Sequence, residues 1–453
     1  MRRIRWDARA ATTRLTGQDV HGIALTWVDN AGLTRVKTIP VARLAQVAER
    51  GVGMSPVFDV YLVDDSMTTS RWVGGPDGDL RLVPDLGRLT TLAGQPGWAW
   101  APVDRLDQRG LPYPGCQRLF ARRMAALAAR RGIEFRMGFE TEWIVQRQDG
   151  TPGCSGPAYG MARVAELTGY LADVMCALTA QGVEVLQLHP EYTAGQFEVS
   201  VAPSDPVGAA DLAVLVRETV RSVSLKHGLT PLFGPAVVVG GVGNGGHLHL
   251  SLWRDGRNLC RDGGGPFGMT ADSEAFLAGV LDALPALLAI GAPSPASYLR
   301  LEPSRWAGVF QCWGLENREA ALRFITGAPD DPDGANAEVK CFDAAANPYL
   351  VVGCVIAAGL AGLDARAVLP APVQGDPAAR DGSSGDDPSS SPSPARLPTS
   401  LSEALERFER SGVLREALGE LLFDAVAAVR RAEIELFEGQ SPQEIADATR
   451  GRY

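Results

Sequence analysis

Two glutamates, Glu191 and Glu198, lie on either side of a Thr-Ala-Gly-Gln sequence that is typical of a tight turn. Glu198 falls in the alternating run Gln-Phe-Glu-Val-Ser-Val, which predicts a strand. Carboxylate oxygens on both sides of a turn could bind one divalent cation. Taken alone, the pair is more often a solvated hairpin with two surface acids, so other parts of the chain must decide.

Further polar pairs occur on predicted strands. Residues 133–145 read as a strand in which Glu140 and Glu142 point to the same side, because side chains alternate between faces. A glycine cluster leads into a second strand whose polar side chains share one face: His247, His249 and Ser251. Each pair alone fits a wet edge strand or a satisfied histidine pair in a core. Their repetition indicates a polar cavity against a sheet.

The chemistry of the combined set favours a hard cation. Glutamates dominate it, with one histidine from the 247/249 pair: Glu140, Glu142, Glu191, Glu198 and Glu338. Such ligands are typical of Mg²⁺ or Mn²⁺ rather than structural zinc. Cationic residues suited to phosphate and carboxylate follow in sequence: Arg300, Arg318, Arg323 and Lys340. Together they suit phosphoryl transfer from ATP, although no Walker, Rossmann or kinase motif is present.

Composition restricts the class of protein. The chain has 453 residues, a net charge of −10 and 45% hydrophobic residues, which predicts a soluble globular protein without a nucleic-acid-binding surface. Seven scattered cysteines form no Cys-x-x-Cys pair and predict reduced thiols in a cytoplasmic protein. No secretory signal is expected. The apolar run Tyr349–Leu363 is too short to cross a membrane and predicts a buried helix.

The order of predicted elements indicates an α+β fold with two domains. Runs at 23–28 and 33–39 predict a β-hairpin in a small N-terminal domain, residues 1–105. The Pro- and Gly-containing segment 94–115 marks the expected boundary before a large domain, residues 110–453. A polar loop at 57–79 is either functional or a mobile surface loop.

The large domain is expected to alternate strands and helices. Helices are predicted at 117–131, 162–181 and 206–227. The Pro/Ser/Gly/Asp-rich segment 372–397 predicts a disordered insert. A capping-box pattern at 400–403 opens a helix to Arg410, Gly412 is expected to break it, and a second helix is expected to reach Glu438.

Six motifs in order carry a resemblance to a known family: GFETE, HPEYTAGQFE, GNGGHLHLS, RLEPSRWAGV, ENREAALR and EVKCFDAAANPYL. The chain resembles the glutamine synthetase family from about residue 60 to 365, and within it the subgroup that makes γ-glutamylpolyamines or γ-glutamylethanolamide. The resemblance implies a small N-terminal β-grasp domain and a large catalytic domain. In the latter, an antiparallel sheet would form a funnel flanked by helices, which holds ATP and two or three Mg²⁺ or Mn²⁺ ions.

The resemblance implies roles for individual residues. The metal nearer glutamate would be bound by Glu142, Glu191 and Glu198, and the metal nearer the ATP phosphates by Glu140, His247 and Glu338. His249 and Ser251 match nucleotide-contacting positions. Arg300, Lys340 and Gly243 match positions around glutamate. Arg318 and Arg323 match residues that stabilise the transferring phosphoryl group, and Glu191 would also face the incoming amine.

The resemblance also implies sharing of sites between subunits. Asp65 aligns with an aspartate of the ammonium site that the neighbouring subunit donates in this family, and Tyr159 aligns with another residue of that site. The expected assembly is therefore a homo-oligomer, a dodecamer of two hexameric rings. The expected partners are glutamate, ATP and an amine, with no nucleic acid and no membrane.

Departures from the family pattern bear on the acceptor. Ammonia-using members have a glutamate on the flap where this chain has Trp306, and an indole suits the carbon chain of an organic amine. Lys340 stands where the family usually has an arginine, and Val242 stands where ammonia-using members often have an asparagine. Asn336 replaces an arginine of the nucleotide site. A ligase for organic amines is the leading interpretation. Alternatives are a glutamine synthetase using ammonia, a Trp306 that merely packs the flap, and a non-catalytic family member with a structural or regulatory role.

Overall fold

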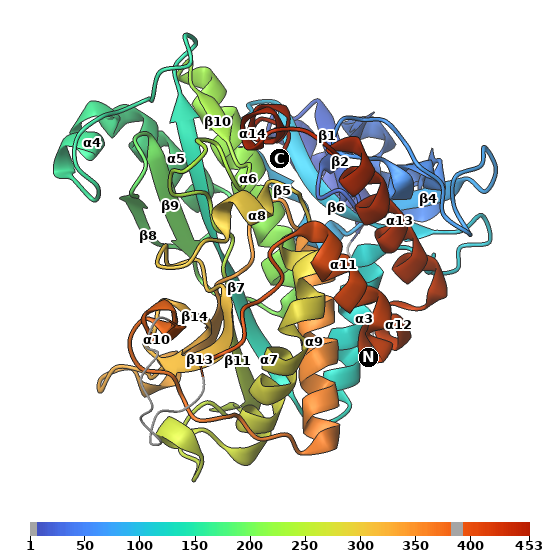
Figure 1. The fold of residues 1–453 in the computed structure, drawn as a ribbon. Coiled ribbons are helices and arrows are strands. Elements are labelled where there is room, and N and C mark those ends of the chain that lie inside the picture. Colours follow the sequence, from blue (N-terminus) through green and yellow to red (C-terminus); the bar gives the residue numbers. More distant parts are fainter. Residues whose placement is uncertain (1–6, 382–392) are drawn as a thin grey trace.

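A computed structural model describes residues 7–381 and 393–453 and contains two β-sheets (Figure 1). The first sheet has the order β2-β1-β6-β4-β3, with β5 paired to β6. Its strands are β1 (Gly22–Val28), β2 (Thr34–Pro40), β3 (Val52–Met54), β4 (Leu80–Pro84), β5 (Thr90–Thr91) and β6 (Trp98–Leu106). Strands β1 and β2 form the predicted antiparallel hairpin, whereas β1 and β6 run parallel.

The second sheet has the order β13-β14-β15-β11-β7-β9-β8, with β10 paired to β7 and β12 to β11. Its strands are β7 (Glu134–Gln146), β8 (Val185–Pro190), β9 (Gln196–Val201), β10 (Thr230–Leu232), β11 (Leu248–Arg254), β12 (Arg257–Asn258), β13 (Phe310–Leu315), β14 (Ala320–Ile325) and β15 (Asn336–Val339). The expectation of a purely antiparallel sheet is wrong for one pair, because β13 and β14 run parallel. The α+β class is confirmed.

Helices cover one face of this second sheet (Figure 1). The α-helices of the described chain are α1 (Ala8–Gly17), α2 (Leu44–Arg50), α3 (Gln117–Ala129), α4 (Met161–Glu166), α5 (Thr168–Ala180), α6 (Pro206–Lys226), α7 (Ala271–Gly291), α8 (Ser297–Arg300), α9 (Pro348–Ala365), α10 (Pro377–Asp381), α11 (Leu401–Arg410), α12 (Gly412–Leu418), α13 (Glu420–Leu436) and α14 (Pro442–Thr449). Helix α6 begins as expected for Asp-Pro, since the Asp205 carboxylate accepts a hydrogen bond from the Gly208 amide.

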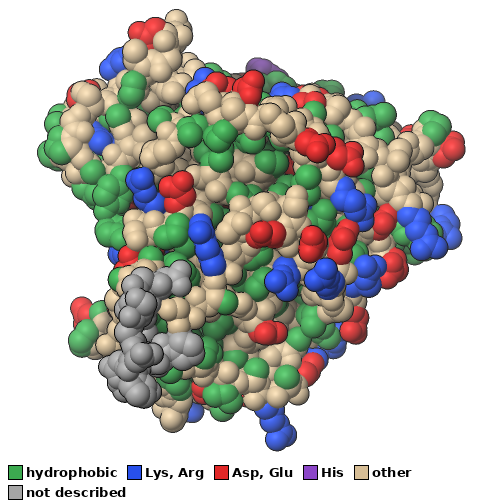
Figure 2. Space-filling view, viewed as in Figure 1, with side chains coloured by type: hydrophobic (Ala, Val, Ile, Leu, Met, Phe, Trp, Pro, Cys, Tyr) green, Lys and Arg blue, Asp and Glu red, His purple; other side chains and the backbone are tan. Residues whose placement is uncertain are grey.

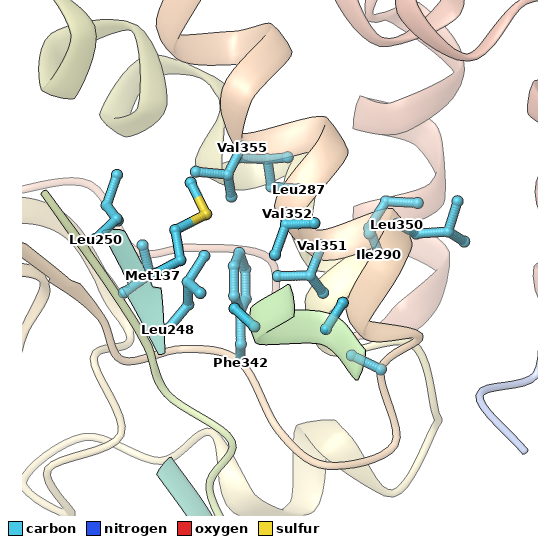
Figure 3. Packing of buried hydrophobic residues seen from close by; sticks show 14 of the residues in the cluster. Met137, Leu248, Leu250, Leu287, Ile290, Phe342, Leu350, Val351, Val352 and Val355 are labelled. Atoms are coloured by element: carbon cyan, nitrogen blue, oxygen red, sulfur yellow. The ribbon is translucent and has the colours of Figure 1, made fainter. Parts of the chain in front are cut away.

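Strand alternation separates the core from the polar face. Met137, Leu248 and Leu250 point toward the helices and pack with Leu287 of α7 and Val352 of α9 (Figure 3). Side chains alternate between the two faces of a strand. The acids of β7 and the histidines at β11 occupy the alternate positions and therefore face the other side of the sheet. The sequence pattern thus places the predicted chemistry on a single face.

Helices α7 and α9 are each long and apolar enough to span a bilayer, by length and composition alone. Most of each helix is buried inside the protein, where the two pack on each other. The prediction of a buried core helix at 349–363 is therefore confirmed by α9. The sequence analysis gave no expectation for α7.

The segment expected to mark the boundary between domains, 94–115, contains strand β6. This strand pairs with β1, β4 and β5 inside the first sheet. Pro102 in the middle of β6 disguised the strand, since proline usually marks an edge or a loop. The division into domains at 105 and 110 stays a prediction.

Three further expectations need correction. The helix predicted at 162–181 is divided at Leu167 into α4 and α5. The helix predicted to end near Arg410 does so, but the second predicted helix, expected to reach Glu438, is divided by Gly419, at φ +76°, into α12 and α13. The predicted capping box forms only in part: the Ser400 hydroxyl accepts from the Glu403 amide at 3.2 Å, but the Glu403 carboxylate accepts from the Thr399 amide rather than from the Ser400 amide. A reciprocal box opens α14 instead.

The predicted disordered insert is ordered at both described ends. The Val373 amide donates to the Trp313 carbonyl at 2.8 Å, and α10 follows. On the other side, the Leu397 amide donates to the Val309 carbonyl at 2.9 Å, so both ends lie along β13. The prediction for residues 382–392 lies outside the described residues.

The surface and the thiols fit the compositional analysis. Acidic and basic side chains are interspersed over the face drawn in Figure 2 rather than gathered by sign. All seven cysteines lie in the described ranges; none forms a disulfide there, and six of them are buried. The absence of a nucleic-acid partner and the cytoplasmic location stay predictions.

Candidate active site

A cavity of about 530 Å³ opens on the polar face of the second sheet. Strands β7, β8, β9, β11 and β14 and the loops around 241–243 and 300–307 supply its walls. Most of the predicted site residues line it: Glu140, Glu142, Tyr159, Glu191, Glu198, Gly243, His247, His249, Arg300, Trp306, Arg318, Arg323 and Lys340. A larger groove of about 1240 Å³ between α7, α9 and α11 is lined largely by alanine, glycine and proline, so we place the chemistry in the smaller cavity.

One half of the cavity floor is charge-balanced. The Glu140 carboxylate contacts His247 Nδ1 at 2.8 Å and His249 Nε2 at 3.1 Å. Glu338 accepts from Lys340 Nζ at 3.0 Å and from Arg323 Nη1 at 3.1 Å. Burial acts to raise the pKa of Glu338, but the charges of Lys340 and the histidines outweigh it and hold the pKa at about 2.

The histidines of this half differ from each other. Burial, together with the nearby charge of Lys340, lowers the pKa of His247 to about 4. Burial also opposes charging of His249, but hydrogen bonding to Glu140 and the charge of Glu338 raise its pKa to about 9. Hydrogen bonds from both rings hold the pKa of Glu140 well below its usual value although the group is buried.

The other half carries excess negative charge. Glu142 and Glu198 lie directly opposite each other on β7 and β9, and Glu191 follows β8. Burial first, and then repulsion by Glu198, raises the pKa of Glu142 to about 8. Burial also raises the pKa of Glu198. Facing carboxylates are destabilising unless a cation lies between them, so this half fits a divalent ion.

Ligand atoms from both halves converge on common points. Three groups have donor atoms within 4.8 Å of one another: Glu140, His249 and Glu338; Glu140, Glu198 and His247; and His189, Glu191 and Glu198. His189 was missed by the sequence analysis. Its Nδ1 lies 3.3 Å from Glu191, and its Nε2 lies 3.3 Å from Glu198. Its position two residues before Glu191 could have suggested it.

Glycines allow the backbone to lie against these ligands. A Cβ atom at Gly245 would come within 2.5 Å of His247 Nε2 and 2.8 Å of the Glu142 carboxylate. A Cβ atom at Gly243 would come within 2.1 Å of the Pro235 carbonyl oxygen. Gln196, also missed from sequence, donates to Glu142 and to the Gly243 carbonyl, at 3.0 Å each. The loop therefore needs glycine on steric grounds.

Arginines of the predicted set differ in how fully they are paired. Arg300 is buried; its Nη2 contacts His247 Nε2 at 3.1 Å and the Lys340 carbonyl at 3.2 Å. Its Nη1 is buried without a partner among the described residues, which fits a group prepared for an anionic ligand. Arg323 is paired with Glu338 and Glu316. Arg318 is exposed on the cavity wall.

Aromatic side chains line the cavity beside the charge-rich half. Tyr159 donates from its hydroxyl to Glu191 at 2.6 Å and stacks on His189. Trp306, in the left-handed region at φ +55°, donates its backbone N–H to Glu319 at 2.7 Å. Its side chain is 47% exposed, which disfavours the alternative that it merely packs the flap. Tyr192, missed from sequence, contacts both rings.

Three predicted residues do not line the cavity within this chain: Asp65, Ser251 and Glu338, the last of which is buried against Lys340 and Arg323. Asp65, at φ +70°, forms ion pairs with Arg35 at 2.6 Å and Arg452 at 3.3 Å. Ser251 accepts a hydrogen bond from the Trp253 indole at 2.8 Å. The predicted role of Asp65 places it in the site of a neighbouring subunit, and all three roles stay predictions.

Comparisons with known proteins agree with this geometry. A family model for the glutamine synthetase catalytic domain matches residues 114–447. The γ-glutamylpolyamine synthetase GlnA3 of Streptomyces coelicolor is 56% identical, covering 98% of this chain and 96% of the relative. A glutamine synthetase of Methanocaldococcus jannaschii is 27% identical, covering 96% and 95%.

Solved structures show the same fold. One described as a novel glutamine synthase homolog has a TM-score of 0.85 and 32% identity, covering 96% of this chain and 99% of that one. GmaS in complex with ADP has a TM-score of 0.83 and 25% identity, covering 95% and 96%. Sequence and structure together show that this chain belongs to the glutamine synthetase family.

Proposed function

We propose that this protein is an ATP-dependent ligase that joins the γ-carboxylate of glutamate to an organic amine, with polyamines as the acceptor class. The observation that carries the proposal is the aromatic wall beside Glu191, in which the exposed indole of Trp306 stands on the flap. The 56% identity to a γ-glutamylpolyamine synthetase supports the same acceptor class.

Members of the family use ATP and divalent metals. The facing carboxylates and the repeated clusters of donor atoms fit two such cations. One would be held by Glu142, Glu191 and Glu198, and the other by Glu140, His247 and Glu338. When bound, the cations would neutralise the phosphate and carboxylate charges.

The reaction then has two steps. An oxygen of the glutamate γ-carboxylate attacks the γ-phosphorus of ATP. ADP is the leaving group, and the product is γ-glutamyl phosphate. The amine nitrogen attacks the activated carbon, phosphate leaves with the C–O bonding pair, and the nitrogen loses a proton. An amine that arrives as an ammonium ion must lose an earlier proton before it can attack, and we assign that first proton to Glu191, because a carboxylate attracts and deprotonates the ammonium group; the proton lost on attack passes to solvent.

The cationic residues would orient the reactants. Arg300, with its unpaired Nη1, would bind a glutamate carboxylate beside the Gly243 loop. Lys340, which Glu338 holds in place by a hydrogen bond, would add positive charge beside that carboxylate. Arg318 and Arg323 would stabilise the transferring phosphoryl group. His249 and Ser251 would contact the nucleotide.

A substrate panel tests the acceptor. Phosphate release from ATP and glutamate is measured with ammonia, ethanolamine, putrescine and longer polyamines. We expect turnover with polyamines and little with ammonia. Strong activity with ammonia and none with the organic amines would instead establish a glutamine synthetase. No turnover with any amine, together with no metal-dependent ATP binding, would favour a non-catalytic role.

The flap offers a more specific test. Trp306→Glu introduces a carboxylate that can attract ammonium and removes apolar surface, so we expect kcat/KM for ammonia relative to putrescine to rise by about 10-fold or more. Trp306→Phe keeps an aromatic ring and serves as the matched variant. An unchanged ratio in Trp306→Glu would remove Trp306 from acceptor selection.

Asp65 suggests that active sites are shared in a homo-oligomer, which we propose to be a dodecamer of two hexameric rings. The Asp65 carboxylate is half exposed and is not among the residues that line this chain's own cavity. A mixture of Asp65→Ala and Glu198→Gln subunits, dissociated and reassembled, should regain activity that neither variant has alone. If reassembled hybrids stay inactive, Asp65 does not act across subunits.

A further inference from the structure

Tyr192 connects the two other aromatic side chains of the cavity. Its ring centroid lies 5.6 Å from that of Tyr159 and 5.4 Å from that of Trp306, with interplanar angles of 81° and 84°. In each T-shaped pair the edge of one ring meets the face of the other, so each contact covers at most one ring face. Tyr192, Tyr159 and Trp306 are 40%, 52% and 47% exposed, although large aromatic side chains are usually well buried.

The chemistry around these rings selects a type of ligand. Tyr159 is hydrogen-bonded to Glu191 and stacks on His189, which in turn contacts Glu198. Aromatic rings beside carboxylates attract a cation that also carries apolar surface. An organic ammonium with a methylene chain therefore fits this wall better than any anionic reactant does.

The wall is held rigid by a buried arginine. Arg163 of α4 is 3% exposed and donates to the carbonyl oxygens of Gly156, at 2.9 Å, and Tyr192, at 3.2 Å. It also donates to the carbonyls of Glu191 and Thr193. One guanidinium thus ties the loop leading to Tyr159 to the turn that carries Tyr192, so the rings are positioned before a ligand arrives.

The side chain of Tyr192 is not needed for this arrangement. All of the contacts that hold its turn are made by the backbone or by neighbouring residues, and the Tyr192 hydroxyl has no hydrogen-bond partner among the described residues. A partly exposed ring with no structural bond at its polar end is a group free to contact a ligand.

From these contacts we infer that Tyr192 is a specificity-determining residue for the acceptor amine. Its ring, between Tyr159 and Trp306, covers the methylene chain of a polyamine and offers a π face to a charged nitrogen. This inference rests on the proposed function of the cavity and adds the residue that selects for chain length.

Steady-state kinetics of the full-length enzyme test the inference. In Tyr192→Leu we expect the KM for spermidine to rise by about 10-fold or more, with the KM for glutamate and for ATP within twofold of wild type. Tyr192→Phe restores the ring and should recover most of the spermidine affinity. Leu186→Ala, an exposed apolar residue of β8 outside the cavity, is the matched control.

The outcomes separate the inference from the function on which it depends. Wild-type turnover with organic amines but an unchanged spermidine KM in Tyr192→Leu overturns the role of Tyr192 alone. Equal increases in the KM for glutamate and for spermidine, or a large loss of thermal stability, indicate a structural role and also overturn it. Wild-type turnover with ammonia only overturns both proposals.

Discussion

The two halves of the cavity floor carry the same kind of acid in opposite electrostatic states. Around Glu140 and Glu338, the histidines and Lys340 outweigh burial and hold both carboxyl pKa values low. Around Glu142 and Glu198, burial raises both carboxyl pKa values, and repulsion by neighbouring carboxylates adds to it: by Glu198 and Glu191 at Glu142, and by Glu140 and Glu191 at Glu198. Lys340, Arg323 and His249 balance the acids of the first half, whereas the three acids of the second half have only His189 and the nearby Arg300, which leaves negative charge for a cation from solution to neutralise.

This difference has a physical consequence for stability. A buried carboxylate with a paired cation is a stable arrangement that is costly to break, whereas facing carboxylates are costly to fold. Binding of a divalent ion would relieve the repulsion in the charge-rich half, so it should stabilise the folded protein. The charge-balanced half, by contrast, depends on intact ion pairs whether or not a metal is present.

Glu198→Gln is expected to have the largest effect on activity. Replacing a predicted metal ligand should reduce kcat by more than about 100-fold. Even the loss of a residue that only supports a metal ligand lowers metal affinity or activity by about 10–100-fold. Without metal the variant should be more stable than wild type, by about 1 kcal/mol, because repulsion with Glu142 is relieved. Thermal denaturation in EDTA and with Mn²⁺ checks both; a loss of stability without metal would contradict the charge-rich assignment.

Glu338→Gln is the matched change in the charge-balanced half, and the stability effect should have the opposite sign. Lys340 and Arg323 would lose their buried partner, which costs about 3 kcal/mol. Urea denaturation in EDTA measures the difference from wild type. If both variants shift the free energy of unfolding in the same direction, the two halves do not differ as described.

A buried acid outside the cavity extends the comparison to pH, with a smaller effect. Burial raises the pKa of Glu433 to about 7, and this carboxylate accepts from the Val63 amide near the Asp65 loop. An unfolded glutamate has a pKa of about 4.3, so the folded protein binds the proton more tightly. The resulting stability is present below about pH 4.3 and is lost as pH rises through about 7.

In the wild type, the free energy of unfolding should fall by up to about 2 kcal/mol between pH 5 and pH 8 because of Glu433. In Glu433→Gln this fall should be absent, because glutamine is neutral at both pH values and keeps an acceptor for the Val63 amide. The free energy of unfolding at the two pH values measures this. Glu435→Gln, an exposed change on the same helix, is the control. A pH dependence that persists in Glu433→Gln would assign it to other groups.

Much of the site could be predicted because alternation is local. Apolar and polar residues alternate along β7 and β11, so Glu140 and Glu142 were placed on one face of their strand, and His247 and His249 on one face of theirs, from sequence. The hairpin at 23–39 and helix α9 were found for similar reasons. Strand β6 was hidden by Pro102, and helix α7 received no expectation.

The residues that were missed act through neighbours distant in sequence. His189 contacts Glu198 only because β8 pairs with β9, and Gln196 donates to Glu142 only because β9 pairs with β7. Tyr192 gains its meaning from Trp306, more than a hundred residues later. Each single residue is unremarkable until strand order and register bring its partner into contact.

The sequence by itself determined the residue types that could bind cations and anions, the faces on which strands present them, and the aromatic residue that replaces an acid at Trp306. Only the tertiary structure decided which acids are balanced and which are not. The reason is that a carboxylate's charge state depends on what faces it: Glu142 lies opposite Glu198, whereas Glu338 lies opposite Arg323 and beside Lys340.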